Sequence, residues 1–272
     1  MSRRGLRNCS GLLAPDPGPE DDTIGAPATD IPEPLTATLR SARKVAVLTG
    51  SGISAESGVP TFRDAQTGLW ARYDPMELAT PEAFERDPCL VWEWYAWRRE
   101  LVGKAAPNPG HEALAELERR VPNFVLLTQN IDGLHRRAGS QNVVELHGNI
   151  TRSKCSVELV LATPHEDDIE VPPSCPGCSA FLRPDVVWFG EALPTGAIED
   201  AFDAARDGDV FFSIGTSGLV QPASLLAFEA LRHGAVVVEI NPDETPLTRH
   251  ADYTLRGRAA EVLSALVRAA YD

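Results

Sequence analysis

The chain has 272 residues, of which 43% are hydrophobic and 24% are charged. These fractions are typical of a globular protein with a real core, and they exclude wholesale disorder and collagen-like or coiled-coil architectures. With 25 Lys and Arg against 39 Asp and Glu, the net charge of −14 argues against nonspecific nucleic-acid binding. We also expect no membrane partner and no secretion, because no apolar run approaches a bilayer span and no apolar core follows the basic N-terminus.

The first 33 residues predict a disordered tail. They contain five prolines among small and acidic residues, with no sustained helical or strand periodicity. Arg3, Arg4 and Arg7 weakly resemble an organelle presequence, but acidic residues follow soon after. We therefore expect an untargeted, cytoplasmic protein, with a mitochondrial location as the alternative.

From residue 34 to residue 272, short β-branched runs alternate with helical patterns. The runs predict strands at 45–48, 124–127, 143–146, 210–214, 236–240 and 253–255, and helices lie between several of them, for example at 109–120 and 223–233. Such alternation indicates one α/β domain with a Rossmann-like, doubly wound parallel sheet. Two segments interrupt it: a helical insertion at about 64–104 and a small cysteine-containing module at about 151–182.

Polar residues follow the ends of five predicted strands, at the sheet edge where open parallel sheets bind ligands. Gly50-Ser51-Gly52 stands between a strand and a helix and could present backbone amides to two phosphates, although a tight turn explains the glycines about as well. Asn130 and Asp132 could form an Asx turn, and His147 could be a hydrogen-bonded structural residue. The convergence of these residues on one face favours a functional site.

Five ordered motifs resemble those of the sirtuins, which are NAD-dependent protein lysine deacylases. They lie at residues 49–63, 128–135, 145–148, 215–217 and 239–241, within a resemblance that spans about 35–271. The resemblance implies NAD as cofactor, acyl-lysine proteins as substrates, and a reaction in which the acyl oxygen replaces nicotinamide on the ribose. Ser51 departs from the family, which usually has alanine there, and its hydroxyl could alter the affinity for NAD.

The resemblance also implies residue roles. His147 is the expected general base, because a neutral imidazole with a pKa near ~6.5 can take a proton from a ribose hydroxyl. Asn130 and Asp132 are further catalytic candidates, whereas His111 and His135 are expected to be structural. The implied NAD-binding residues are Gly50, Ser51, Gly52, Ser54, Glu56, Phe62, Arg63, Gln129, Asn130, Ile131, Asp132, Gly215, Thr216, Ser217, Asn241 and Pro242.

The stretch 186–191 resembles the segment that pairs with the substrate backbone, with 218–220 as the opposite rail. It contributes Val187, Phe189, Gly190 and Glu191 as substrate-binding candidates, and the alternative for 186–189 is an ordinary buried strand. Two rival functions use the same NAD site. They are mono-ADP-ribosyl transfer to another acceptor and a non-enzymatic NAD-sensing module.

Tyr95 and Arg98 lie three residues apart in a predicted helix, so a phenol and a guanidinium share one face and could bind a carboxylate. From the residues alone, an aromatic packing face with Arg98 paired to a surface glutamate such as Glu93 is the alternative. Both residues resemble the Tyr-x-x-Arg of desuccinylase-type, class III sirtuins, and Ala79 resembles the small residue that widens their acyl channel. The resemblance thus implies a preference for succinyl, malonyl or glutaryl groups over acetyl, with plain deacetylation as the alternative.

Three of the five cysteines are clustered, which favours metal binding over a disulfide framework. A ribbon-type zinc site needs two cysteine pairs, each with two residues between, and Cys175 and Cys178 form one such pair. The sirtuin resemblance implies a second pair, but Glu158 stands three residues after Cys155. We expect zinc held by three cysteines and Glu158, and a metal-free ribbon stays open as the alternative.

Overall fold

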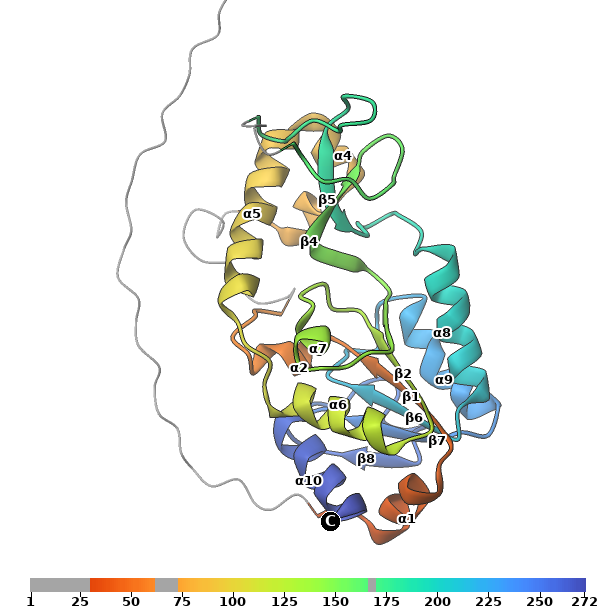
Figure 1. Cartoon of the computed structure of the whole chain (residues 1–272). Helices are drawn as coiled ribbons and strands as arrows, with labels where there is room; N and C mark the ends of the chain where they lie inside the picture. Colours follow the sequence, from red (N-terminus) through yellow and green to blue (C-terminus); the bar gives the residue numbers. More distant parts are fainter. Residues whose placement is uncertain (1–29, 62–72, 166–169) are drawn as a thin grey trace, which may run out of the picture.

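The computed structural model describes residues 30–61, 73–165 and 170–272 and is built around a six-stranded sheet (Figure 1). Every strand pairing in that sheet is parallel. The strands are β1 (Lys44–Thr49), β2 (Asn123–Thr128), β3 (Val143–Glu145), β6 (Val210–Ile214), β7 (Val236–Ile240) and β8 (Tyr253–Leu255). All six predicted strands are therefore confirmed, to within one residue at each end.

The spatial order β3-β2-β1-β6-β7-β8 is that of a doubly wound dinucleotide-binding sheet. The chain adds strands on one side of β1 and then continues on the other side, so the order reverses between β1 and β6. In such sheets the ligand crevice lies at this reversal, outside the carboxyl ends of the strands. The fold therefore directs attention to the loops that follow β1 and β6.

Helices cover both faces of the sheet (Figure 1). One face packs against α1 (Glu33–Ser41), α6 (Pro109–Arg120) and α10 (Ala259–Tyr271), and the other against α8 (Thr195–Asp207) and α9 (Leu226–Arg232) with the preceding 3₁₀ turn Ala223–Leu225. Strand alternation explains the division: Val45 and Val47 belong to the first core, whereas Ala46 and Leu48 belong to the second. The short helix α2 (Ser51–Ala55) follows β1 directly, and α7 (Leu134–Arg137) follows β2.

The two insertions form a second lobe with one shared core. Three helices of the first insertion, α3 (Pro75–Leu78), α4 (Pro81–Arg86) and α5 (Pro88–Lys104), each begin with a side-chain cap followed by proline, a common helix-start pattern. The other insertion forms an antiparallel pair, β4 (Gly148–Cys155) and β5 (Leu182–Val186). Trp94 and Val102 of α5 pack with Ile150 of β4 and Val186 of β5, so the insertions stabilise each other.

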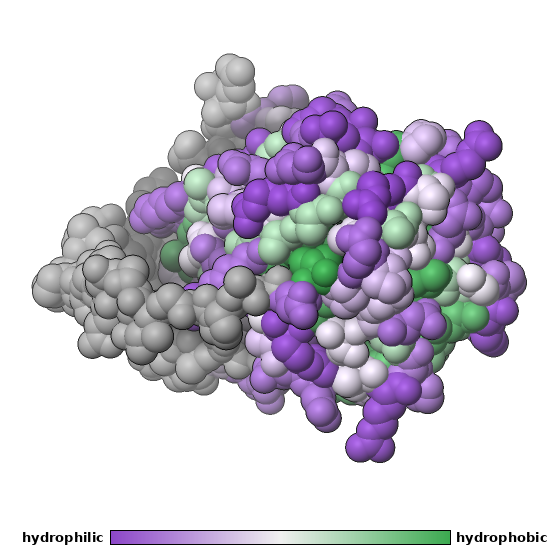
Figure 2. Space-filling view, turned by 90° about the horizontal axis from the view of Figure 1, so that it is seen from below, coloured by the Kyte–Doolittle hydropathy of each residue, from purple (hydrophilic) through white to green (hydrophobic). Residues whose placement is uncertain are grey.

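The sheet domain carries no large apolar surface on the side shown in Figure 2, where hydrophobic residues form small patches between hydrophilic ones. No helix in the described ranges is long and apolar enough to cross a membrane.

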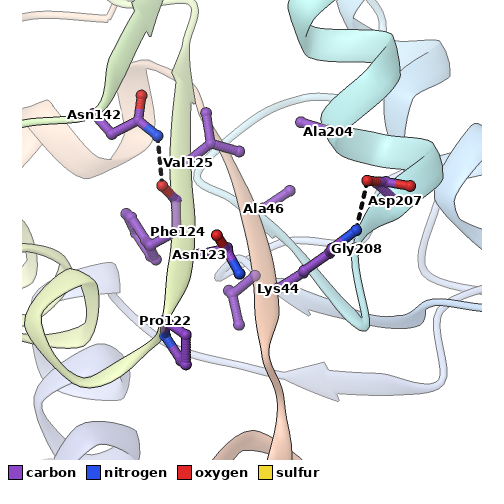
Figure 3. Close-up of a pocket in the computed structure, with 11 residues that line it drawn as sticks. Lys44, Ala46, Pro122, Asn123, Phe124, Val125, Asn142, Ala204, Asp207 and Gly208 are labelled. Carbon is purple, nitrogen blue, oxygen red and sulfur yellow. Dashed lines mark hydrogen bonds and ion pairs between the residues drawn. The ribbon is translucent and has the colours of Figure 1, made fainter.

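A pocket of about 480 Å³ lies at the amino-terminal ends of β1 and β2, where Lys44 pairs with Asp207 at 2.6 Å (Figure 3). This pocket is at the opposite edge of the sheet from the predicted site.

Candidate active site

The loops after β1 and β6 contact each other through glycine backbone. Gly50 N donates to Ile214 O at 3.0 Å, and Gly52 N donates to Gly215 O at 2.9 Å. A Cβ atom at Gly52 would lie 2.7 Å from Gly215 Cα, and one at Gly50 would lie 2.8 Å from Gly215 O, both closer than real Cβ contacts. The close approach of the two loops therefore requires glycine at both positions. The N–H groups of both glycines are already engaged in hydrogen bonds between these loops.

A buried polar network lies directly behind this turn. Asn130 Nδ2 donates to Gly50 O at 3.0 Å and lies 3.1 Å from Ser54 Oγ, which in turn donates to Asp132 Oδ2 at 2.7 Å. Leu134 N donates to the other oxygen of Asp132 at 2.8 Å, which is the predicted Asx-type bond. Burial raises the pKa of Asp132, and the two donors oppose that rise. Asn130 and Asp132 thus fix the β1 and β2 loops relative to each other.

The loops after β2, β6 and β7 meet at Thr216. Gln129 Nε2 donates to its hydroxyl at 3.0 Å, and Asn241 Nδ2 donates to its carbonyl at 2.8 Å. The structure therefore brings three of the five predicted loops together at this residue. Glu56 is engaged elsewhere: its carboxylate accepts from Ala260 N at the start of α10, at 3.0 Å. Phe62 and Arg63 lie outside the described residues.

His147 follows β3 and has a defined tautomer. Its Nδ1 lies 2.9 Å from Gln129 O, and because a carbonyl only accepts, Nδ1 must carry the proton. Nε2 is then the basic nitrogen. Burial lowers the pKa of His147 below its ordinary value, and the bond to Gln129 partly offsets this, so the ring is neutral at physiological pH. The arrangement suits a general base.

His111 and His135 are structural, as the sequence analysis expected. His111 Nδ1 accepts from Asn108 N and closes the cap of α6, while His135 Nε2 lies 2.9 Å from Thr49 Oγ1. Their rings are 4.8 Å apart in the interior. Burial lowers the pKa of His111 to about 4 and that of His135 to about 3, so both rings are neutral.

The acyl-pocket candidates lie in the second lobe. Tyr95 and Ala79 are 1% and 3% exposed, and Arg98 lies over the Trp94 ring with 5.1 Å to the ring centroid. Ala79 O accepts from Phe189 N at 2.9 Å, which joins the end of α3 to the predicted substrate segment.

The predicted substrate segment is not an ordinary strand beyond Val186, where β5 ends. Val187 N donates to His147 O at 2.9 Å, so the segment runs directly beside the candidate base. Phe189, Leu219 and Val220 are 40%, 59% and 41% exposed, which leaves apolar side chains uncovered on both predicted rails. Gly190 has a positive φ of 86° and forms the turn after Phe189.

Glu191 is held inside the protein by a residue that the sequence analysis did not identify. Both of its carboxylate oxygens accept from Arg183, at 2.6 and 2.8 Å, and one also accepts from Trp188 N at 2.8 Å. The Glu191 carboxylate is therefore already engaged within the protein. Arg183 stands between Leu182 and Pro184 in a short strand, and this was the available signal, because a buried guanidinium needs a partner.

The three clustered cysteines converge as predicted. The sulfur atoms of Cys155, Cys175 and Cys178 all lie within 4.8 Å of one another, and the exposed Glu158 donates its backbone N–H to Cys155 Sγ at 3.4 Å. The chain makes the same turn twice: Leu159 N donates to Cys155 O at 3.1 Å, and Ser179 N donates to Cys175 O at 2.8 Å. Glu158 is therefore the fourth residue of the turn that begins at Cys155, just as Cys178 is the fourth residue of the turn that begins at Cys175.

The comparisons with known proteins agree with this geometry. A family model described as the Sir2 family matches residues 50–222. An NAD-dependent protein deacylase of Aquifex aeolicus is 52% identical, with 79% of this chain and 90% of the relative covered. NAD-dependent protein deacylase 1 of Pseudomonas aeruginosa is 49% identical, with coverages of 86% and 96%.

Solved structures give the same result. The crystal structure of a complex between a Sir2 homologue and NAD has a TM-score of 0.82 and 48% identity, with 89% of this chain and 94% of that chain covered. A Sir2 complex with a p53 peptide and NAD has a TM-score of 0.76 and 30% identity, with coverages of 87% and 97%. On both the sequence and the structural comparison, the chain belongs to the Sir2 family.

Proposed function

We propose that this NAD-dependent protein deacylase prefers lysine acyl groups that end in a carboxylate, such as succinyl, malonyl and glutaryl, over acetyl. One observation carries the proposal: Tyr95 and Arg98 share a face of α5, on which Tyr95 is buried in the core of the second lobe and Arg98 is half-buried. A buried phenol beside a half-buried guanidinium forms a site for an anion, because arginine binds carboxylates with two parallel hydrogen bonds. Ala79 has the smallest chiral side chain at the neighbouring buried position.

The sheet edge fits a dinucleotide at the point where the strand order reverses. The start of α2 and the Gly215 turn lie together there, and the polar side chains of Gln129 and Asn241 meet at Thr216. When bound, NAD supplies the ribose and the nicotinamide leaving group. His147 Nε2 is available to take a proton from a hydroxyl, because Nδ1 is committed to Gln129 O. A Sir2 homologue has been solved with 2'-O-acetyl ADP ribose, and we infer that this chain releases the corresponding O-acyl product.

The test compares matched peptides that differ only in the acyl group on one lysine. We expect a higher kcat/KM for succinyl-lysine than for acetyl-lysine, with nicotinamide and O-acyl-ADP-ribose released from both. The matched variant Arg98→Met keeps the length of the side chain and removes its charge. A wild-type enzyme that favours acetyl-lysine would contradict the proposal, and transfer of ADP-ribose to protein without loss of the acyl group would favour the rival activity.

We also propose that the cysteine cluster holds a structural zinc ion with Glu158 as the fourth ligand. The support is the repeated turn, in which Glu158 follows Cys155 at the spacing by which Cys178 follows Cys175, together with the N–H of Glu158 on Cys155 Sγ. The Glu158 carboxylate is not within the cluster of the three sulfur atoms, so its side chain would turn toward them when zinc binds. That N–H contributes to lowering the pKa of Cys155, and zinc binds the thiolate rather than the thiol. Because thiolates bind zinc better than carboxylates do in closed structural sites, Glu158 should hold the ion less tightly than a cysteine would.

Metal analysis of protein purified without added metal tests the zinc proposal directly. We expect about one zinc per chain. Release to a chelator should be faster in Glu158→Ala than in the wild type and slower in Glu158→Cys. A zinc content near zero would establish the metal-free ribbon, and equal release rates in all three proteins would show that Glu158 is not a ligand.

A further inference from the structure

A chain of buried contacts connects Glu191 to the hydroxyl of Tyr95. Glu191 binds Arg183 through both carboxylate oxygens, and the Arg183 guanidinium lies 3.3 Å from the centroid of the Trp188 ring. The Trp188 indole Nε1 then donates to Tyr95 Oη at 3.0 Å. Trp188 and Tyr95 are 2% and 1% exposed. The indole is therefore held on one side by a paired arginine, and its N–H points at the phenol.

This contact determines what the phenol can do. An indole nitrogen only donates, so in the bond with Trp188 the Tyr95 oxygen must be the acceptor. The single proton of the Tyr95 hydroxyl is then free for another acceptor, and within the described part of the chain Trp188 is the only hydrogen-bond partner recorded for this hydroxyl. Burial also raises the pKa of Tyr95 to about 12, so the proton stays on the phenol at physiological pH.

We propose that Trp188 is a positioning residue for acyl specificity, which orients the Tyr95 O–H so that it donates to the carboxylate of an acidic acyl group. The inference rests on the proposed preference for such groups and adds a residue outside α5 to the site. Arg98 lies one helical turn from Tyr95 on the same face and supplies the charge. The Arg183–Glu191 pair acts indirectly, because Arg183 packs on the indole ring of Trp188 and holds it in place.

Trp188→Phe removes the N–H and keeps an aromatic ring between Arg183 and Phe84, whose ring centroid lies 5.4 Å from that of Trp188. Loss of one neutral hydrogen bond corresponds to roughly a threefold to tenfold change. We therefore expect the ratio of kcat/KM for succinyl-lysine to that for acetyl-lysine to fall by about this factor. The fall should arise mainly from KM for the succinyl peptide, since binding of the carboxylate precedes and accompanies the chemistry.

Trp92→Phe is the matched control, because Trp92 also lies under an arginine, Arg99, with 4.7 Å to its ring centroid, and is not among the hydrogen-bond or ring partners of Tyr95 in the described structure. Its selectivity ratio should stay at the wild-type value. In a Tyr95→Phe background, Trp188→Phe should cause no further loss of selectivity, because it acts through the phenol. Turnover of acetyl-lysine in each variant reports correct folding, and it is measured together with the thermal midpoint.

Three results would overturn the inference while leaving the proposed preference intact: a selective wild type with an unchanged ratio in Trp188→Phe, equal losses on both substrates, or an additive loss in the Tyr95→Phe background. Equal losses would assign Trp188 to packing alone. A wild-type enzyme without any preference for succinyl-lysine would instead refute the proposed function. The two failures are therefore distinguishable in one set of measurements.

Discussion

The buried pair His111 and His135 makes the stability of this fold depend on pH. Both rings are fully enclosed, at 0% and 2% exposure, and burial holds their pKa values at about 4 and about 3. In the unfolded chain a histidine has a pKa near ~6.5. Above that pH both rings are neutral in the folded and unfolded states and the full stability is present. Below it the unfolded chain binds protons that the folded protein cannot accept.

The free energy of unfolding therefore falls as the pH drops, from about 6.5 toward the folded pKa values. Well below pH 6.5 each histidine contributes a loss that approaches about 1.4 kcal/mol per pH unit, so the pair removes about 4 kcal/mol between pH 7.5 and pH 5. That is a large share of a typical stability of roughly 5–15 kcal/mol. The carboxylates whose pKa values are lowered, such as Glu191 and Glu229, titrate at lower pH and do not contribute in this window.

Urea denaturation followed by circular dichroism at pH 7.5, 6.5 and 5 measures this loss. The double variant His111→Asn and His135→Gln keeps an acceptor near Asn108 N and a polar atom near Thr49, and its stability should vary much less over the same range. His250→Gln, which changes an exposed histidine, is the control and should keep the wild-type pH dependence. A wild-type change below about 1 kcal/mol would refute the argument that the buried pair resists protonation.

Three further outcomes are expected. Arg98→Met should lower kcat/KM for succinyl-lysine by about tenfold or more and affect acetyl-lysine far less, and equal losses would make Arg98 a structural residue. His147→Ala should abolish deacylation of every acyl-lysine peptide while the thermal midpoint stays close to wild type, so substantial turnover in a folded variant would exclude His147 as the base. Gly52→Ala forces a Cβ to within 2.7 Å of Gly215 Cα, so we expect a loss of about 1–3 kcal/mol of stability and a higher KM for NAD; an unchanged protein would show that the turn can open at no cost.

The fold was predictable because its signals are local. Runs such as Val210–Ile214 and Val236–Ile240 are short, apolar and separated by helical patterns, which is sufficient to predict a parallel sheet. The shared core of the two insertions was not predictable in the same way. Trp94 of α5 and Val186 of β5 are far apart in sequence, and no local pattern shows that their helix and strand pack together.

The sequence predicts which residues lie at the carboxyl edge of the sheet, but it does not predict their hydrogen-bond partners within the protein. Strand ends locate Gly50, Asn130 and His147, since topology brings those ends to one edge. Whether an amide or a carboxylate is free depends on tertiary partners. Gly52 N donates to Gly215 O, and the Glu191 carboxylate accepts from Arg183, so in both cases the structure shows that the group expected to be available already has a partner within the protein.

The division of the molecule into a sheet domain and a second lobe separates the proposed general base from the residues that we propose select the acyl group. His147 and the loops around Thr216 belong to the sheet, whereas Tyr95, Arg98 and Trp188 belong to the lobe. The two meet where Val187 N donates to His147 O, one residue before Trp188. Because no hydrogen bond or ring contact given above for the described residues joins these proposed specificity residues to His147, we expect substitutions in the lobe to alter which acyl-lysine is bound and to leave the proposed proton transfer at His147 intact.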